Sequence, residues 1–345
     1  MNISMAGYQA ISILRGGPNT QLRNTAKHLA AFDIHAQFFD PWAPFAPERC
    51  DAFHLFAANI GTYHLAREIH DLGIPLVVSP IIFSLHSPFF IRTMLGITKT
   101  VQALGKGMWS DYALTSDVCR WAQAVLPNTR AEASLLQNGL GVDHAKVEII
   151  PNGVDERFFS ADPGLFRKKY GLANFILNVG HTGHARKNVL RLIKALGHID
   201  HPAVIIGRII RNDYGSACVR EASKHKHILL IDGMENDSDL LASAYAACDT
   251  FVLPSLFETP GIAALEAALA GAKVAITRFG GTEEYFGDMA EYVDPRSVDS
   301  IMDGIRKVLE KKKDGRLQTH IRNEFLWSRV AEKTARVYRS LVRRQ

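Results

Sequence analysis

Two glutamates lie close together in the segment Leu253-Pro-Ser-Leu-Phe-Glu258-Thr-Pro-Gly-Ile-Ala-Ala-Leu-Glu266-Ala. The preceding Thr250–Leu253 is β-branched and apolar, which is typical of a buried parallel strand. Pro260 suits the first turn of a helix, because its missing N–H is not needed there. Strong helix formers follow, and Gly271 is a natural stop. We therefore expect Glu258 in a loop and Glu266 about two turns inside a helix.

The start of this helix is a ready site for an anion. The backbone N–H groups of Gly261, Ile262 and Ala263 are free in the first turn, and the helix dipole favours negative charge beside them. A nucleotide sugar would suit the segment, because its pyrophosphate fits the helix start and its ribose and hexose hydroxyls fit the two carboxylates. An ordinary α/β crossover with two solvated glutamates explains the segment equally well.

Cations occupy a second loop between a strand and a helix, in the run Asn178-Val-Gly-His181-Thr-Gly-His-Ala-Arg186-Lys187-Asn188. Arg186 and Lys187 can neutralise a pyrophosphate that gains charge as its bond to a sugar breaks. The alternative is a basic helix start, which the helix dipole disfavours. The run lacks the Gly-Lys-Ser/Thr ending of a P-loop and the glycine spacing of a dinucleotide fingerprint. We therefore interpret it as a diphosphate-binding loop.

Three further motifs each have a structural alternative. The glycines of Arg15-Gly16-Gly17-Pro18 permit close approach of backbone to a phosphate, and a tight turn explains them nearly as well. Phe279-Gly280-Gly281-Thr282-Glu283-Glu284 is equally compatible with a phosphate or sugar contact and with a structural turn. Asp237-Ser238-Asp239 has the spacing of an Asp-x-Asp metal motif, but an N-cap explains it better. We expect no metal site, and the histidines show no metal-ligand or triad spacing.

Strand and helix patterns alternate along the chain, which predicts parallel sheets covered by helices. There are too many strands for one compact sheet, and the turn-rich stretches Pro151–Asp155 and Ser160–Gly164 predict a hinge between two doubly wound domains. Ligands of such sheets bind outside the carboxyl ends of the strands, so we expect the site in a cleft. The expected strands are Ile74–Val78, Val147–Ile150, Phe175–Val179, Val204–Ile206, Ile228–Ile231, Phe251–Leu253 and Val274–Ile276. The expected helices include Thr62–Leu72, Thr129–Gln137, Asn188–Leu196, Asp239–Ala247 and Val298–Leu309.

The 345 residues are enough for two cores, and the formal net charge is +5. The positive charge concentrates in residues 301–345, where thirteen Lys/Arg stand against five Asp/Glu. No nucleic-acid motif accompanies it, so we expect solvated helix faces and no nucleic-acid partner. Four scattered cysteines form no disulfide or zinc pattern, which favours a reducing cytosol. We find no signal peptide and no apolar run that approaches a membrane span.

A basic amphipathic helix is expected over residues 88–106. Phe90, Met94, Ile97, Val101 and Leu104 fall on one face, and Arg92, Lys99 and Lys106 fall on the opposite one. Such a helix can lie on an anionic membrane surface, and it can equally turn its apolar face to the core and its charged face to water. We favour the core-facing interpretation and keep peripheral membrane contact as the alternative.

Taken together, these segments resemble the retaining family 4 glycosyltransferases (group 1) of the GT-B fold. The resemblance spans nearly the whole chain and is strongest over residues 147–295. Several motifs in the right order are far more specific than any one of them. They are Ile150-Pro-Asn-Gly-Val-Asp155, Val179-Gly180 with Arg186-Lys187-Asn188, Asp232-Gly-Met234, Leu253-Pro-Ser with Glu258, Gly261 and Glu266, Gly280-Gly-Thr-Glu-Glu284, and a last helix from Phe325.

The resemblance implies a role for each of these residues. Glu266 would bind the ribose of the donor, Glu258 the donor sugar, and Arg186 with Lys187 the diphosphate. Backbone near Met234 would touch the base. Gly16 and Gly17 would approach the phosphates from the other domain, and the helix start at Gly261, Ile262 and Ala263 completes the donor site. No nucleophile is evident, so the resemblance implies attack on the same face, assisted by the leaving phosphate, without a metal or other cofactor.

Two departures from the family pattern affect these roles. His181 stands where the family often has arginine after Val-Gly, which affects one phosphate contact. Ile81 stands where the family often has histidine, and His86 lies five residues on. The sequence therefore does not decide whether Ile81 or His86 of the N-terminal domain faces the donor sugar.

The sequence thus predicts an α/β protein of the GT-B fold, with two doubly wound Rossmann-like domains that face an interdomain cleft. Residues 1–155 would bind the acceptor, 156–325 the nucleotide sugar, and helix 326–345 would cross back. We expect a cytoplasmic transferase, or one peripheral on the inner face of the membrane, that moves a hexose from a UDP- or GDP-sugar to a saccharide or lipid-linked acceptor. The alternatives are a sugar-nucleotide epimerase or phosphorylase on this fold and a non-catalytic binding protein.

Overall fold

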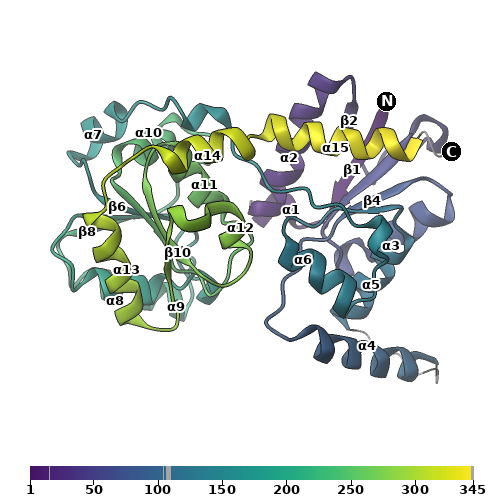
Figure 1. Cartoon of the computed structure of the whole chain (residues 1–345), viewed down its shortest axis with the longest axis horizontal. Helices are drawn as coiled ribbons and strands as arrows, with labels where there is room; N and C mark the ends of the chain where they lie inside the picture. The colour runs from purple at the N-terminus through teal and green to yellow at the C-terminus, as the bar shows by residue number, and fades with distance from the viewer. Residues whose placement is uncertain (15, 104, 106–109, 343–345) are drawn as a thin grey trace. The chain divides into compact units, whose positions relative to one another are not determined.

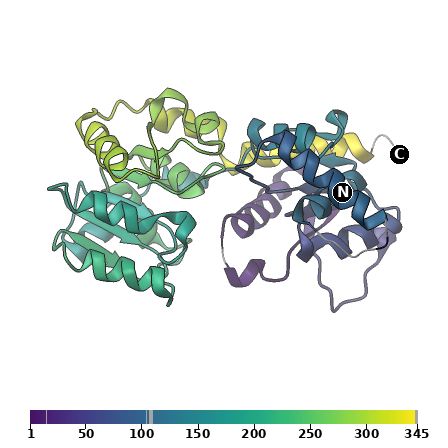
Figure 2. The ribbon, with the colours of Figure 1, turned by 90° about the horizontal axis from the view of Figure 1, so that it is seen from below.

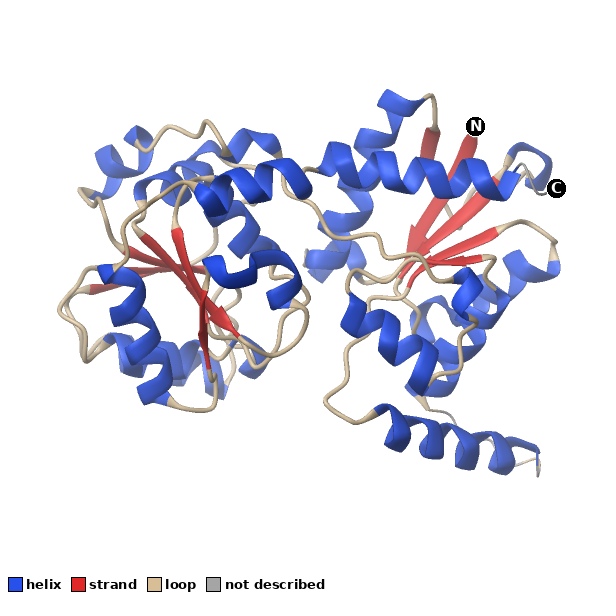
Figure 3. Cartoon of the chain, in the orientation of Figure 1, coloured by secondary structure: helices blue, strands red, loops and turns tan. Residues whose placement is uncertain are grey.

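The computed structural model describes residues 1–14, 16–103, 105 and 110–342. The chain divides into two compact units: unit 1 comprises Met1–Gly153 and Trp327–Gln345, and unit 2 comprises Val154–Leu326. The boundaries expected from the sequence, after residues 155 and 325, differ from these by one or two residues. Within each unit a sheet lies between helices (Figures 1 and 3).

Unit 1 is a five-stranded parallel sheet in the order β2-β1-β3-β4-β5. Its strands are β1 (Asn2–Gly7), β2 (His35–Phe38), β3 (Ala52–Phe56), β4 (Leu76–Ser79) and β5 (Ala124–Val125). Its helices are α1 (Ile11–Leu14), α2 (Gly17–Leu29), α3 (Ile60–Asp71), α4 (Pro88–Ala103), α5 (Asp111–Trp121), α6 (Arg130–Ser134) and α15 (Trp327–Val342).

Unit 2 is a six-stranded parallel sheet in the order β11-β10-β9-β6-β7-β8. Its strands are β6 (Ile176–Val179), β7 (Ala203–Ile206), β8 (Ile228–Ile231), β9 (Thr250–Leu253), β10 (Lys273–Thr277) and β11 (Glu291–Val293). Its helices are α7 (Gly164–Tyr170), α8 (Val189–Leu196), α9 (Asp213–Ala222), α10 (Asp239–Ala247), α11 (Ile262–Leu269), α12 (Thr282–Phe286), α13 (Val298–Glu310) and α14 (Arg316–Glu324).

The two faces of the unit 2 sheet carry separate apolar cores because successive residues of a strand point to opposite faces. Leu177 and Phe251 pack with α10, α11 and α14 on one face. Ile176 and Val252 pack with α8, α9 and α13 on the other. The sheet of unit 1 is likewise covered on both faces. The prediction of two doubly wound α/β domains is confirmed.

The strand order places a switch point in each sheet. In unit 2, successive strands from β6 run outward in one direction, and those from β9 run outward in the other. The pairing of β6 with β9 ends at Leu177 and Phe251, after which the two strands diverge. The side chain of Asn178 spans the divergence and donates to the carbonyl of Val252 at 2.7 Å. In open α/β sheets, ligands bind where strand order reverses, outside the carboxyl ends.

The sequence patterns did not predict four short strands. The strands β2, β3, β5 and β11 lack a continuous apolar run, since β2 is mostly exposed, β3 contains His54 and β5 has only two residues. The expected strand Val147–Ile150 was wrong. Val147 forms a single bridge to Val125, because β5 ends there and offers no longer ladder. The predicted helix Thr129–Gln137 ends at Ser134 and continues as a π-helical segment to Gly139.

Helix α15 is fixed to the sheet of unit 1 by a buried polar chain. The imidazole of His54 lies 2.6 Å from the hydroxyl of Tyr338 through Nδ1 and 3.0 Å from the hydroxyl of Ser79 through Nε2. Burial lowers the pKa of His54 to about 3, so the ring is neutral at physiological pH. The contact therefore joins α15 to β3 and β4 without burying a charge.

Helix α4 lies at the outside of unit 1 (Figure 2), and its buried side differs from the expected one. Ile91, Leu95 and Thr98 are buried, whereas Phe90 and Ile97 are 44% and 49% exposed. The reason is that Ile91 joins the apolar core where α4 packs against α5 and the π-helical segment, and this sets the rotation of the helix. Leu104 and Lys106 of the expected faces, and Arg15 of the first glycine loop, lie outside the described residues.

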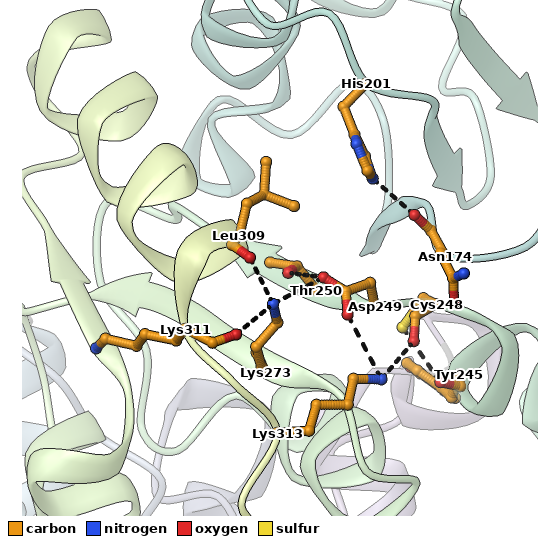
Figure 4. A network of polar contacts seen from close by, with 10 residues as sticks. All are labelled: Asn174, His201, Tyr245, Cys248, Asp249, Thr250, Lys273, Leu309, Lys311 and Lys313. Carbon is orange, nitrogen blue, oxygen red and sulfur yellow. Dashed lines mark hydrogen bonds and ion pairs between the residues drawn. The ribbon is translucent and has the colours of Figure 1, made fainter.

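Several basic residues from the C-terminal part of the chain pair with carboxylates of unit 2. Figure 4 shows Lys273, the first residue of β10, with its ammonium 2.9 Å from Asp249 and from the carbonyl oxygens of Leu309 and Lys311. Lys313 reaches Asp249 at 3.8 Å. Lys273 is only 11% exposed. This network joins the end of α13 to the amino ends of β9 and β10. Lys313, one of the excess basic residues of 301–345, therefore has a structural role.

We expect Lys273→Met to lower the free energy of unfolding by about 1–3 kcal/mol, because two carbonyls and a carboxylate lose a charged donor. The exposed Lys312→Met is the matched control and should change the free energy by under about 0.5 kcal/mol. Denaturant titration followed by circular dichroism measures both. Equal stability of the two variants would contradict the role of this network.

Candidate active site

The loops that follow β6, β9 and β10 meet at the switch point of unit 2. Arg186 and Lys187 lie in a 3-10 turn, Ala185–Lys187, directly before α8. Asn188 follows in the left-handed conformation, at φ 57°. Its side-chain amide donates to the carbonyls of Pro254, after β9, and Pro295, after β11, at 2.9 and 2.7 Å. One asparagine therefore fixes the basic turn against two neighbouring loops.

Glu258 forms the centre of the site. Its Oε1 lies 2.6 Å from Nζ of Lys187 and 3.5 Å from a guanidinium nitrogen of Arg186. The glutamate side chain is 8% exposed, against 20% for Lys187 and 42% for Arg186. An ordinary α/β crossover would leave Glu258 solvated, so the burial of this side chain excludes that interpretation for Glu258. Arg186 also donates to the carbonyl of Phe257 at 3.1 Å and covers the ring of that residue.

The electrostatics keep Glu258 ionised. Burial alone would raise the pKa of its carboxyl, but Lys187 and Arg186 outweigh that effect and hold the pKa below its ordinary value. The cluster has one more positive than negative charge. An anion bound beside it would complete the charge balance.

The glycine loop after β10 supports the backbone of Glu258. Residues 258 and 280 form a parallel bridge, and Glu258 N–H donates to the carbonyl of Phe279 at 3.0 Å. Gly280 has φ 105°, and a Cβ there would lie 1.9 Å from the carbonyl oxygen of Glu258. Only glycine permits this approach. The sequence left open whether this loop contacts a ligand or forms a structural turn. These backbone contacts support the structural turn.

Helix α11 begins one residue after Gly261, which is its N-cap at φ 84°. No side chain caps this end among the described residues. The N–H groups of Gly261, Ile262 and Ala263 are therefore available at the helix start, as expected. Two details were wrong: Pro260 lies before the helix because Gly261 supplies the turn, and Glu266 is the fifth helical residue, little more than one turn inside.

Glu266 is partly exposed and has one buried partner. The hydroxyl of Tyr245, in α10, donates to its Oε2 at 2.7 Å. Burial raises the pKa of Glu266 to about 7, an effect that the Tyr245 hydrogen bond and Arg157 reduce in part. The tyrosine fixes one oxygen of the carboxylate and leaves the other to accept from a ligand.

The remaining predicted residues lie in three places. His181 is partly exposed in the loop after β6, in ring contact with His184. Met234 follows β8 and packs at the edge of the core. Gly16 and Gly17 cap and begin α2 in unit 1, after β1. The structure thus brings together Arg186, Lys187 and Glu258 through direct contacts, and it places Glu266 on the helix that follows the Glu258 loop.

Sequence reasoning missed the roles of Asn188 and Tyr245. Asn188 belonged to a quoted motif, and asparagine before a helix is a known sign of a special backbone conformation. Tyr245 gave no signal, because it stands in an apolar helical pattern where a core position is the natural interpretation. Ser238 caps α10 as expected, accepting from Leu241 N–H at 3.3 Å.

Within the described residues, no group of three or more His, Cys, Asp or Glu side chains has the arrangement of a metal site. What the site offers is a pair of cations, an uncapped helix start and two carboxylates with separate environments. Such a set can bind a diphosphate through the cations and N–H groups and hydroxyl groups through the carboxylates.

Comparison with known proteins agrees with this chemistry. Residues 166–324 match the family described as Glycosyl transferases group 1, and residues 48–158 match Glycosyltransferase Family 4. An uncharacterized glycosyltransferase of Methanocaldococcus jannaschii is 31% identical over 217 residues, which cover 56% of this chain and 54% of that protein. The chain thus spans about half the length of the curated relatives it matches.

Solved structures extend the likeness over the whole fold. Sucrose-phosphate synthase from Thermosynechococcus elongatus aligns over 100% of both chains, with a TM-score of 0.77 and 17% identity. Anabaena HepE in complex with UDP and glucose covers 98% of this chain and 99% of its own, with a TM-score of 0.75 and 16% identity. With two family matches along the chain and this common architecture, the protein belongs to the group 1 glycosyltransferases of family 4 and has the GT-B fold.

Proposed function

We propose that the protein transfers a hexose from a nucleoside diphosphate sugar to a saccharide or lipid-linked saccharide, in the synthesis of a polysaccharide or glycolipid. The observation that carries the proposal is the cluster of Lys187, Arg186 and Glu258 beside the uncapped start of α11 at the switch point. A UDP- or GDP-sugar presents a diphosphate and a hydroxylated ring at one end, which is the combination that this cluster complements.

The cations serve the leaving group. As the bond between sugar and phosphate breaks, the diphosphate gains negative charge, and Lys187 with Arg186 stabilises it most at that moment. Lys187 has three N–H donors, so it can keep Glu258 and bind a phosphate oxygen at the same time. Glu258 is held in place by this pair, and its carboxylate accepts from hydroxyls of the donor sugar. The N–H groups at Gly261, Ile262 and Ala263 bind the second phosphate.

The other donor contacts follow from the same arrangement. Glu266 accepts from the ribose hydroxyls through the oxygen that Tyr245 leaves open. Backbone near Met234 contacts the base, and His181 lies in the diphosphate loop. We also assign the backbone N–H groups of Gly16 and Gly17, at the start of α2, to phosphate binding. HepE was solved with UDP and glucose, which favours a uridine donor for this chain too.

We infer transfer with retention of the anomeric configuration. The bond from the anomeric carbon to the diphosphate oxygen breaks, and the acceptor oxygen bonds to that carbon on the same face. The proton of the acceptor hydroxyl passes to the leaving phosphate oxygen. Lys187, Arg186 and the α11 dipole supply the positive charge for this step, so it needs no metal ion.

Peripheral membrane contact is a separate part of the proposal. No helix among the described residues is long and apolar enough to cross a bilayer. Helix α4 nevertheless exposes Phe89 to 82% and Ile97 to 49%, with Arg92 and Lys99 exposed on the same helix. Apolar side chains next to cations suit the surface of an anionic membrane. We propose that α4 rests on that surface, on the cytoplasmic side.

Neutralising the cluster should slow transfer strongly without unfolding the protein. We expect Lys187→Met and Glu258→Gln each to lower kcat/KM roughly 10²–10³-fold in a nucleotide-release assay with UDP- and GDP-sugars. The double variant removes both charges, so it should recover the stability that Lys187→Met loses and remain inactive. Lys194→Met, exposed on α8, is the control. Normal release by the single variants would contradict the site.

Donor affinity should depend on the ionisation of Glu266. With its pKa at about 7, the carboxyl is mostly neutral at pH 6 and cannot accept from both ribose hydroxyls. We expect the affinity for UDP-glucose to fall about tenfold from pH 8 to pH 6, as titration calorimetry would measure. Glu266→Gln should bind weakly at both values. Tyr245→Phe should move the inflection to higher pH, because the hydrogen bond that lowers the pKa is lost. If the curve of donor affinity against pH has the same midpoint in Tyr245→Phe as in the wild type, the proposed effect of Tyr245 on the ionisation of Glu266 is wrong.

Removing exposed apolar side chains from α4 should weaken membrane binding. We expect the double variant Phe89→Ser and Ile97→Ser to sediment at least about threefold less with vesicles of phosphatidylcholine and phosphatidylglycerol. Leu165→Ser, which removes a 51% exposed leucine from α7, is the control and should bind as the wild type does. If the α4 variant and the wild type sediment alike, α4 is not the contact.

A further inference from the structure

A cavity of about 290 Å³ opens in unit 1 between α4, α5 and the segment that follows the π-helical turn. Arg92 and Lys99 come from α4, Arg120 from α5, and Lys146 from the chain after α6. Four cations from three parts of the chain thus line one cavity. Helix α5 runs into β5, so Arg120 lies toward the amino end of that strand, away from the carboxyl ends where Gly16 and Gly17 lie.

The carboxylates near this cavity do not balance its cations. Asp117 pairs with Arg120, and Asp143 lines the wall while accepting from the N–H of Ala145 at 3.0 Å. Lys146 donates to the carbonyl of Arg120 at 2.9 Å. Among the residues that line the cavity, one carboxylate faces four cations, and with Asp117 beside Arg120 a net positive charge still remains.

Arg92 and Lys99 are the cations without a partner. Neither makes a hydrogen bond or ion pair with any residue in the described part of the chain. Partial burial, and then the nearby charge of Arg120, lower the pKa of Lys99. Like charges held together in this way repel one another, and a bound anion would relieve that repulsion.

The cavity walls offer further donors of the right kind. Guanidinium groups bind phosphate oxygens in pairs, and Arg92 and Arg120 provide two of them. The N–H of Gly141, at φ 72°, has no acceptor among the described residues. Ser116 is occupied, since its hydroxyl donates to the carbonyl of Leu140 at 3.1 Å. Leu95 gives the cavity one apolar side.

We propose that this basic cavity is a second binding site, specific for a phosphate-bearing group. Its size admits one small phosphorylated molecule or one lipid headgroup. It is formed by unit 1 alone, and it shares no residue with the candidate active site. The phosphate comes either from the headgroup of an anionic phospholipid or from a free phosphorylated metabolite, and both present the same dianionic or monoanionic oxygens to Arg92, Lys99 and Arg120.

Phosphate binding by the cavity can be separated from binding at the active site. Inorganic phosphate would be titrated into the full chain carrying Lys187→Met, which removes one of the two cations of the active site and so weakens phosphate binding there. We expect this protein to bind phosphate, and the further change Lys99→Ala with Arg92→Ala to weaken binding at least about tenfold. Lys99→Arg should retain it. Arg49→Ala, an exposed charge of unit 1 outside the cavity, is the control.

Vesicles identify the source of the phosphate. If Lys99→Ala with Arg92→Ala loses binding both to inorganic phosphate and to phosphatidylglycerol vesicles, while Arg49→Ala loses neither, the ligand is a headgroup. If inorganic phosphate binding depends on the cavity and vesicle binding does not, the ligand is a free phosphorylated molecule. Melting temperatures confirm that the variants are folded, which is expected for exposed side chains. Phosphate binding that is indifferent to Arg92 and Lys99 overturns the proposal, because a loss of vesicle binding alone would reflect only the contact of α4 with the membrane.

Discussion

The 2.6 Å contact between Lys187 and Glu258 is the interaction on which the site depends. A carboxylate that is 8% exposed is costly unless a cation accompanies it, and a lysine beside a helix start is opposed by the helix dipole. Each residue compensates for the other. The pair joins the loop after β6 to the loop after β9, and so it bridges the switch point of the sheet. Its net charge with Arg186 is positive, which suits a diphosphate.

The surrounding structure keeps this pair in place with backbone contacts. Asn188 holds the basic turn to the loops after β9 and β11, and Gly280 allows the chain after β10 to lie against Glu258. Neither residue touches a reacting atom in our proposal. Their effect is to fix the direction of two side chains before a substrate binds, which is how binding energy is directed to the transition state.

The sequence predicted the architecture and the main site residues well, because both rest on local patterns. Alternating strands and helices predicted two parallel sheets, and the Glu258 and Arg186-Lys187 segments stand directly after apolar strands. The failures have physical causes. The strands β2, β3 and β5 are short or interrupted, so they lack periodicity. The buried side of α4 depends on how Ile91 fits a core formed by distant residues. Tyr245 meets Glu266 only through the tertiary fold, which no local pattern encodes.

A crystal structure of the protein with an intact UDP-sugar would test the central claim most directly. We predict that one phosphate lies within hydrogen-bond distance of Nζ of Lys187, that the other contacts the N–H groups of Ile262 and Ala263, and that Glu258 accepts from a sugar hydroxyl. A nucleotide sugar bound elsewhere in unit 2, with Lys187 and Glu258 paired only to each other, would contradict the account.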